Sequence, residues 1–158
     1  MTVRLASAAV LAAAPALAQI APPPDGNAEA ARIVEAAAAT CAEERSGPLF
    51  VEPEAYVPHD LDGDGDMDLV IDHEFMGCAR NVAAFGGSGG TLKSFVLDGT
   101  ASVTWQGGPW HTVDLPEGLR LILLPVHGTW CDGAGATPCY RAIAASGGEL
   151  TSIVTAPE

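Results

Sequence analysis

The residues of this chain best suited to chemistry are the aspartates between positions 60 and 68. An aspartate stands at every second position of this stretch, at Asp60, Asp62, Asp64, Asp66 and Asp68, with Gly63 and Gly65 between them. Calcium is a hard cation that takes roughly six to eight oxygen ligands at about 2.3–2.6 Å. A loop that carries carboxylates at this spacing can wrap one such ion, so the stretch predicts a calcium site.

The individual positions support this interpretation. Asp60, Asp62 and Asp64 occupy the first, third and fifth places of a calcium loop, and Gly65 in sixth place permits the sharp turn. We expect Asp66 to contribute its backbone carbonyl, and Asp68 to bind the ion directly or through water. The twelfth place holds Ile71 instead of the Glu of an EF-hand, and a strand-like run follows. An EF-hand pair is therefore excluded.

The stretch from Asp60 to Ile71 resembles the calcium loops of FG-GAP repeats (VCBS, integrin-type), in which a similar aspartate run leads directly into an apolar strand. The resemblance covers about a dozen residues and implies Ca²⁺ bound by Asp60, Asp62, Asp64, Asp66 and Asp68. It does not imply a propeller, because one repeat cannot build one.

Two other interpretations of the aspartates remain open. One is a solvated acidic turn, although carboxylates about 6 Å apart repel each other by roughly 0.7 kcal/mol per pair even in water. Such crowding has little structural use without a cation. The other is magnesium, which prefers fewer protein ligands and more water than calcium does.

No catalytic group can be assembled from the remaining residues. His73-Glu74 is not followed by a histidine at metalloprotease spacing, and no Gly-x-Ser-x-Gly elbow occurs. We interpret His59 as a neighbour of the acidic loop and not as a ligand. The three tryptophans, Trp105, Trp110 and Trp130, are expected to pack in the core, with a sugar- or peptide-binding platform as the alternative.

The N-terminus is typical of a secretory signal peptide. Arg4 precedes an apolar run from Leu5 to Leu17, and Ala16-Leu17-Ala18 provides a small-x-small cleavage site. The run is too short for a membrane anchor, which needs about 20 apolar residues. We therefore predict a signal peptide over residues 1–18 and export to the periplasm or beyond, with no membrane insertion after cleavage.

Charge restricts the partners of the mature chain. Removal of 18 of the 158 residues leaves 140, enough for one domain, and the loss of Arg4 takes the net charge from −13 to −14. A protein this acidic repels phosphate backbones and anionic lipid. Nucleic acid is therefore excluded as a partner, and we expect a monomer that binds a protein or another component of the cell envelope.

Four cysteines, Cys41, Cys78, Cys131 and Cys139, predict two disulfides in an exported protein. Four cysteines allow three pairings, and the sequence alone does not choose among them. Cys131 and Cys139 flank a turn-rich tip that can bring them together, which would leave Cys41 for Cys78. A structural zinc site is the alternative, but Cys-x-x-Cys spacing is absent.

Several elements must position these residues. A proline-rich tether over 19–26 precedes a predicted helix from Asn27 to about Glu44, whose weakly apolar face carries Ala30, Val34, Ala37 and Cys41. Strand patterns follow at 49–51, 69–71, 92–97, 101–105, 110–115, 119–126, 140–144 and 150–154, with turn residues between most of them. Asp98-Gly99 predicts a two-residue hairpin turn. Residues 84–90 are a Gly-rich connector.

One helix followed by short strands predicts an α+β domain over 27–158, in which the N-terminal helix packs on an antiparallel sheet with tight turns. The layout also resembles a group of small periplasmic proteins with an N-terminal helix, one aspartate loop and Gly-rich stretches, a resemblance that implies no activity. We expect a binding or interaction module with a structural Ca²⁺. The alternatives are an envelope hydrolase and an acidic inhibitor of a basic envelope enzyme.

Overall fold

The computed structural model describes residues 20–24 and 26–153, so the predicted signal peptide and the predicted start at Gln19 lie outside the described residues. One α-helix, α1 (Ala28–Glu43), precedes the strands. These are β1 (Leu49–Val51), β2 (Tyr56–His59), β3 (Asp68–Asp72), β4 (Met76–Cys78), β5 (Gly86–Gly87), β6 (Gly90–Leu97), β7 (Ala101–Gly107), β8 (His111–Asp114), β9 (Arg120–Pro125), β10 (Tyr140–Ser146) and β11 (Glu149–Ile153). The paired strands are antiparallel, and the predicted α+β class is confirmed.

The helix α1 begins at a side-chain cap. The Asn27 carboxamide oxygen accepts the backbone N–H of Ala30 at 2.8 Å, which satisfies one of the free amides at a helix start. The buried face holds Ala30, Ile33, Val34, Ala37 and Cys41. After α1, Arg45 adopts a φ of 54°, a left-handed conformation that turns the chain towards β1.

The central sheet has the order β2-β3-β6-β5, and β7 pairs with the opposite edge of β6, from Thr91 to Leu97. The predicted central strand at 69–71 is β3, which lies between β2 and β6. Successive residues of β3 and β6 point to opposite faces, and both faces are buried. Leu69, Ile71 and Val96 join one hydrophobic cluster with α1, β1 and β4, whereas Val70, Phe95 and Leu97 join a second cluster.

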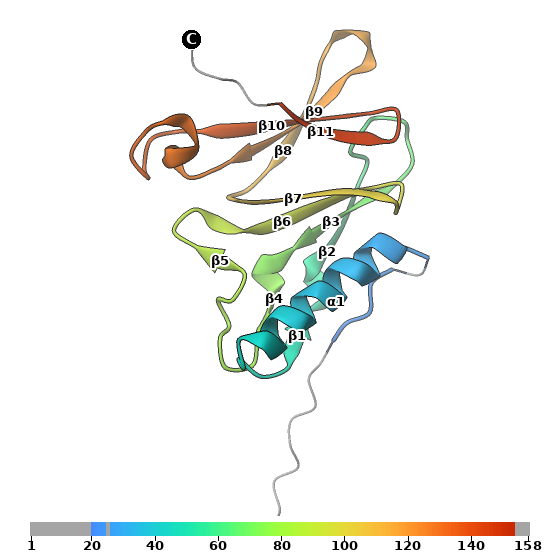
Figure 1. Cartoon of the computed structure of the whole chain (residues 1–158). Helices are drawn as coiled ribbons and strands as arrows, with labels where there is room; N and C mark the ends of the chain where they lie inside the picture. The colour runs from blue at the N-terminus through green and yellow to red at the C-terminus, as the bar shows by residue number, and fades with distance from the viewer. Residues whose placement is uncertain (1–19, 25, 154–158) are drawn as a thin grey trace, which may run out of the picture.

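A second sheet, with the order β11-β10-β9-β8, covers the other face of the central sheet (Figure 1). Its inward side chains include Ile122, Leu124, Ile143 and Ala145, all fully buried. The predicted hairpins 110–126 and 140–154 correspond to β8–β9 and β10–β11. The layers therefore run from α1 with the β1–β4 pair, through the central sheet, to the second sheet.

Three details differ from the sequence-based expectations. The β6–β7 turn has three residues, Asp98 to Thr100, because Leu97 pairs with Ala101; Asp98 and Gly99 have φ values of 52° and 66°. The apolar run at 121–124 predicts a strand buried on both faces, but β9 is fully buried on one face only, since Leu121 and Leu123 are half-buried. The strand β2 was not predicted; it contains Pro58 and pairs only with β3, as expected for an edge strand.

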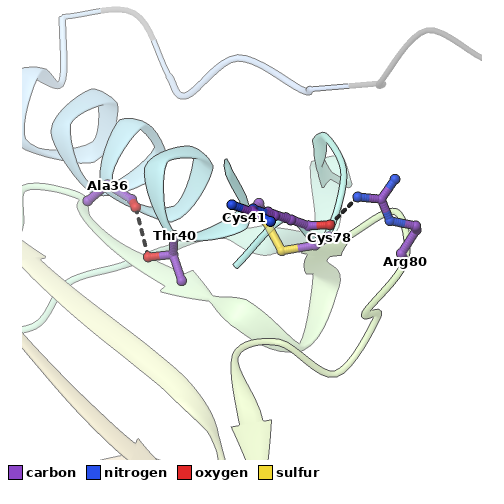
Figure 2. Close-up of a disulfide and its surroundings, with 6 residues drawn as sticks. Ala36, Thr40, Cys41, Cys78 and Arg80 are labelled. Atoms are coloured by element: carbon purple, nitrogen blue, oxygen red, sulfur yellow. Dashed lines mark hydrogen bonds between the residues drawn. A yellow bond between two sulfur atoms is a disulfide. The ribbon is translucent and has the colours of Figure 1, made fainter. Parts of the chain in front are cut away.

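The structure contains two disulfides, Cys41–Cys78 and Cys131–Cys139, and this is the favoured pairing. Cys41 lies near the end of α1 and Cys78 ends β4, so the first disulfide joins the helix to the β1–β4 pair (Figure 2). Beside it, the Arg80 guanidinium donates to the backbone carbonyl of Arg45. Cys41 and Cys78 are both fully buried.

The described part of the predicted tether lies along the domain. Ile20 forms an isolated bridge with Val51, and the Ala21 N–H donates to the Val51 carbonyl at 3.0 Å. The Tyr56 hydroxyl donates to the Ala21 carbonyl at 2.9 Å. Across residues 20–24 and 26–153, no helix combines the length and the apolar character needed to cross a membrane.

Candidate metal centre

The acidic loop joins β2 to β3, and its aspartates divide into two sets. Asp60, Asp62 and Asp68 each place a carboxylate oxygen within 4.8 Å of the other two. This is the one group of three or more possible metal-binding side chains in the described part of the chain. Asp64 and Asp66 are exposed and contribute no oxygen to this group. We call Asp60, Asp62 and Asp68 the aspartate triad.

Hydrogen bonds from the loop backbone hold its carboxylates. The Asp60 carboxylate accepts the N–H of Gly63 at 2.6 Å and that of Gly65 at 3.3 Å. The loop turns inward at these two glycines, whose φ values of 86° and 96° suit glycine far better than other residues. Two Asx turns follow along the loop: the Asp62 carboxylate accepts the Asp64 N–H at 3.2 Å, and the Asp64 carboxylate accepts the Asp66 N–H at 2.8 Å.

Asp68 differs from the other loop aspartates because it is buried, with 7 % of its surface exposed. Its Oδ2 accepts the Leu61 N–H at 2.8 Å, and its Oδ1 accepts the Asp98 N–H at 2.9 Å. Each carboxylate oxygen has two lone pairs, so both oxygens keep acceptor capacity after these bonds. Asp68 therefore holds the backbone of Leu61, at the start of the loop, and that of Asp98, in the β6–β7 turn. It can still bind a cation.

Arg120 of β9 also contributes to the site, and the sequence analysis missed it. Its Nη1 donates to the Asp60 carbonyl at 2.8 Å and lies 3.3 Å from Asp60 Oδ1. Its Nε donates to the Asp114 carboxylate at 2.5 Å. That hydrogen bond is the main reason why the pKa of Arg120 is raised. Arg120 lies 60 residues from Asp60 in the sequence, so no local pattern indicates the contact.

Within the triad, the carboxyl of Asp62 shows the electrostatic cost of the crowding. The pKa of the Asp62 carboxyl is raised, first by desolvation and then by the nearby charges of Asp64, Asp68 and Asp60, against the lowering effect of its bond from Asp64 N–H. Crowded, partly desolvated carboxylates favour any state that neutralises them. A bound divalent cation would remove this cost.

The donor set consists of carboxylate oxygens, which suit a hard cation such as calcium or magnesium. Two ligands on opposite sides of a calcium ion stand at most about 5.2 Å apart, so oxygens within 4.8 Å of one another can share one ion. A zinc site would need histidine or cysteine. The nearest histidine in sequence, His59, instead places Nε2 3.2 Å from the Thr112 hydroxyl and packs edge-on against Trp110.

The other histidines lie apart from the triad. His73 is buried against Phe85, with Nε2 3.0 Å from the Ser94 hydroxyl, and His127 contacts Thr129. Burial lowers the pKa of His73 to about 4, so the ring is neutral at pH 7. His111 is exposed on β8.

Comparisons with protein-family models, with curated proteins and with solved structures find no match for this chain.

Proposed function

We propose that the chain is an exported calcium-binding domain in which one Ca²⁺ ion is structural, and that the domain serves as a binding or interaction module in the periplasm or outside the cell. The observation that carries the proposal is the convergence of Asp60, Asp62 and Asp68, with one oxygen each within 4.8 Å. In this proposal Asp64 and the backbone carbonyl of Asp66 complete the ligand set when the ion binds.

A structural role is favoured over a catalytic one by the contacts of Asp68. This ligand is buried and bonded to the backbone of Leu61 and Asp98, so an ion there would join three segments. Binding energy at such a site adds to folding stability, because the unfolded chain does not present the assembled ligands. The N-terminal helix α1, tied to β4 by Cys41–Cys78, would belong to the stabilised unit.

Export is supported by the two disulfides, since such bonds persist in oxidising compartments. The signal-peptide pattern of residues 1–18 supports the same location.

Calorimetry and thermal melting of the exported protein test the calcium proposal. We expect one equivalent of calcium to bind and, at 100 times Kd, a stabilisation of about 2.7 kcal/mol. Asp62→Asn should abolish most of this gain, because it removes the negative charge of a triad carboxylate while the side chain keeps nearly the same shape. Asp66→Asn is the matched control, since it retains the backbone carbonyl, and it should preserve most of the gain. An absence of heat and an unchanged melt in the unmodified protein would refute the proposal.

A further inference from the structure

A second cationic feature lies at the edge of the interface between the two sheets, away from the acidic loop. Arg141 of β10 points inward, and only 8 % of its surface is exposed. Its guanidinium carbon lies 3.9 Å from the centre of the Trp105 ring on β7 and 5.5 Å from that of Trp130. The two indoles meet edge to face at 5.6 Å. We call these three side chains the Arg141 stack.

Within the part of the chain that the structure describes, the guanidinium of Arg141 has no anionic partner. Among residues 20–24 and 26–153, no ion pair or hydrogen bond involves its side chain. The other buried cation, Lys93, pairs with Asp72, and Arg120 pairs with Asp114 and Asp60. The guanidinium nitrogens are not among the solvent-inaccessible polar atoms of the described residues, so the charged end of this mostly buried side chain reaches the surface. An accessible guanidinium with no anion among the described residues points to an anionic ligand.

Stacking leaves the binding edge of Arg141 available. A guanidinium that lies over an aromatic ring keeps its N–H groups in its own plane, where they match the two oxygens of a carboxylate. The Trp105 Nε1–H in the same stack also has no acceptor within the described residues, but it is closed to solvent, and Trp105 does not line the cleft beside Arg141. The guanidinium therefore supplies the donors for a guest that carries acceptor oxygens.

The opening beside Arg141 limits the size of the group that can enter. Arg141, Val126 and the Cys131–Cys139 disulfide line a cleft of about 20 Å³, and Trp130, Tyr140 and Ile153 complete its walls. This is slightly more than one water molecule requires. The three wall residues are also exposed, Trp130 by 60 % and Tyr140 by 57 %. The cleft therefore admits one oxygen of a small anionic group, whose attached apolar body rests on these rings.

We propose that the Arg141 stack binds an organic monocarboxylate, with the carboxylate on the guanidinium and its apolar or aromatic body against Trp130 and Tyr140. One guanidinium balances a single negative charge, whereas a phosphate dianion would leave excess charge in a chain of net charge −13. The proposal is independent of the calcium proposal, because it uses none of the residues of the acidic loop.

Titration of the exported protein with benzoate, and with uncharged benzamide of the same shape, tests this assignment. Binding is followed by tryptophan fluorescence and by the indole N–H resonances of Trp105 and Trp130. We expect saturable benzoate binding that moves these resonances, and at least roughly ten-fold weaker binding of benzamide, since a hydrogen bond to a charged group is worth about that factor or more. Arg141→Met should reduce benzoate affinity to a similar extent.

Two further variants make the result decisive. Trp130→Ala, at an exposed wall position, should weaken benzoate more than acetate, because acetate has no ring to contact it. Arg32→Met removes an exposed arginine on α1 and should leave benzoate binding unchanged. Equal affinities for benzoate and benzamide, or unaltered benzoate binding in a folded Arg141→Met protein, would overturn the proposal.

Discussion

The carboxylate of Asp68 accepts the backbone N–H of Asp98 at 2.9 Å and so joins the acidic loop to the β6–β7 turn. The same turn contacts the start of α1, where the Glu29 N–H donates to the Gly99 carbonyl at 3.4 Å. The Glu29 carboxylate also accepts from the hydroxyl of Ser102, near the start of β7. The loop, the turn and the first residues of the helix therefore form one contiguous set of contacts.

Asp68→Asn should destabilise the protein even without calcium. An asparagine retains one acceptor oxygen, so either the buried Leu61 N–H or the half-buried Asp98 N–H would lose its acceptor. Such a loss costs about 1–3 kcal/mol. Urea denaturation in the presence of a chelator measures the change.

Asp62→Asn provides the comparison for the Asp68 variant. The raised pKa of Asp62 means that folding disfavours its charged form, so neutralising it without calcium should leave stability unchanged or slightly higher. Equal losses of stability in the two variants would contradict the distinct role assigned to Asp68.

Arg120→Gln should strengthen calcium binding. The guanidinium lies 3.3 Å from Asp60 Oδ1 and would repel a divalent ion at the triad, whereas glutamine can still donate to the Asp60 carbonyl. A gain of about 1 kcal/mol, or roughly five-fold in affinity, is expected at low salt. Calorimetry at two salt concentrations measures it, and the gain should shrink at the higher one. Weaker binding would mean that Arg120 mainly orients the loop.

Calcium and the Cys41–Cys78 disulfide should stabilise α1 together. Replacing Cys41 and Cys78 by serine opens the loop that their disulfide closes, which has a sequence separation of 37. In the chain-entropy treatment this disulfide contributes about 4 kcal/mol to the free energy of unfolding. If α1 is held at one end by the disulfide and at the other by contacts that depend on the acidic loop, the effects of calcium removal and cysteine replacement will not add. Denaturation of the four combinations measures the coupling, and hydrogen exchange in α1 should quicken on chelation.

The second disulfide is the control for this coupling. Cys139 belongs to the cluster on the opposite face of the central sheet, and the loop has a sequence separation of only 8. Its replacement should cost about 2.5 kcal/mol and add simply to the effect of calcium removal. Additive losses for both disulfides, with unchanged exchange in α1, would show that the loop is an independent unit.

His73 should make the protein less stable in mild acid. Its pKa falls from 6.5 in the unfolded chain to about 4 in the folded one, mainly through burial, so below pH 6.5 the unfolded state takes up a proton that the folded state does not. The stability is complete above pH 6.5 and is lost as the pH falls towards 4, by about 2 kcal/mol between pH 7 and pH 5. Denaturation curves at these two pH values measure the loss.

Variants separate His73 from other titrating groups. His73→Gln should flatten the dependence between pH 7 and pH 5, whereas His111→Gln, at an exposed position, should not change it. An unchanged slope in the His73 variant would assign the effect to other residues.

The sequence predicts features that depend on local patterns. The strands around Asp98-Gly99 and Pro116-Glu117-Gly118 follow from turn chemistry, and the favoured disulfide pairing follows from chain proximity at Cys131 and Cys139. The strand β4 was not predicted, because Gly77 at its centre interrupts the apolar pattern of its three residues.

The composition of the triad and its cationic neighbour could not be predicted either. The alternating pattern of the loop predicts five aspartates as metal ligands. The backbone turns at Gly63 and Gly65 determine that only Asp60, Asp62 and Asp68 of these converge. Arg120 and Arg141 are brought to their neighbours by pairing within the second sheet and by packing between the sheets. A single sequence holds no local pattern for either contact.

The burial of β3 and β6 on both faces has a consequence for proteolysis. A protease cut in the connection before β8 would separate a fragment that retains α1 and the central sheet but loses the cover over Val70, Phe95 and Leu97. A sheet face with such apolar side chains associates with other chains when it meets water. The nicked product would therefore form aggregates, and the intact second sheet protects the central one from self-association.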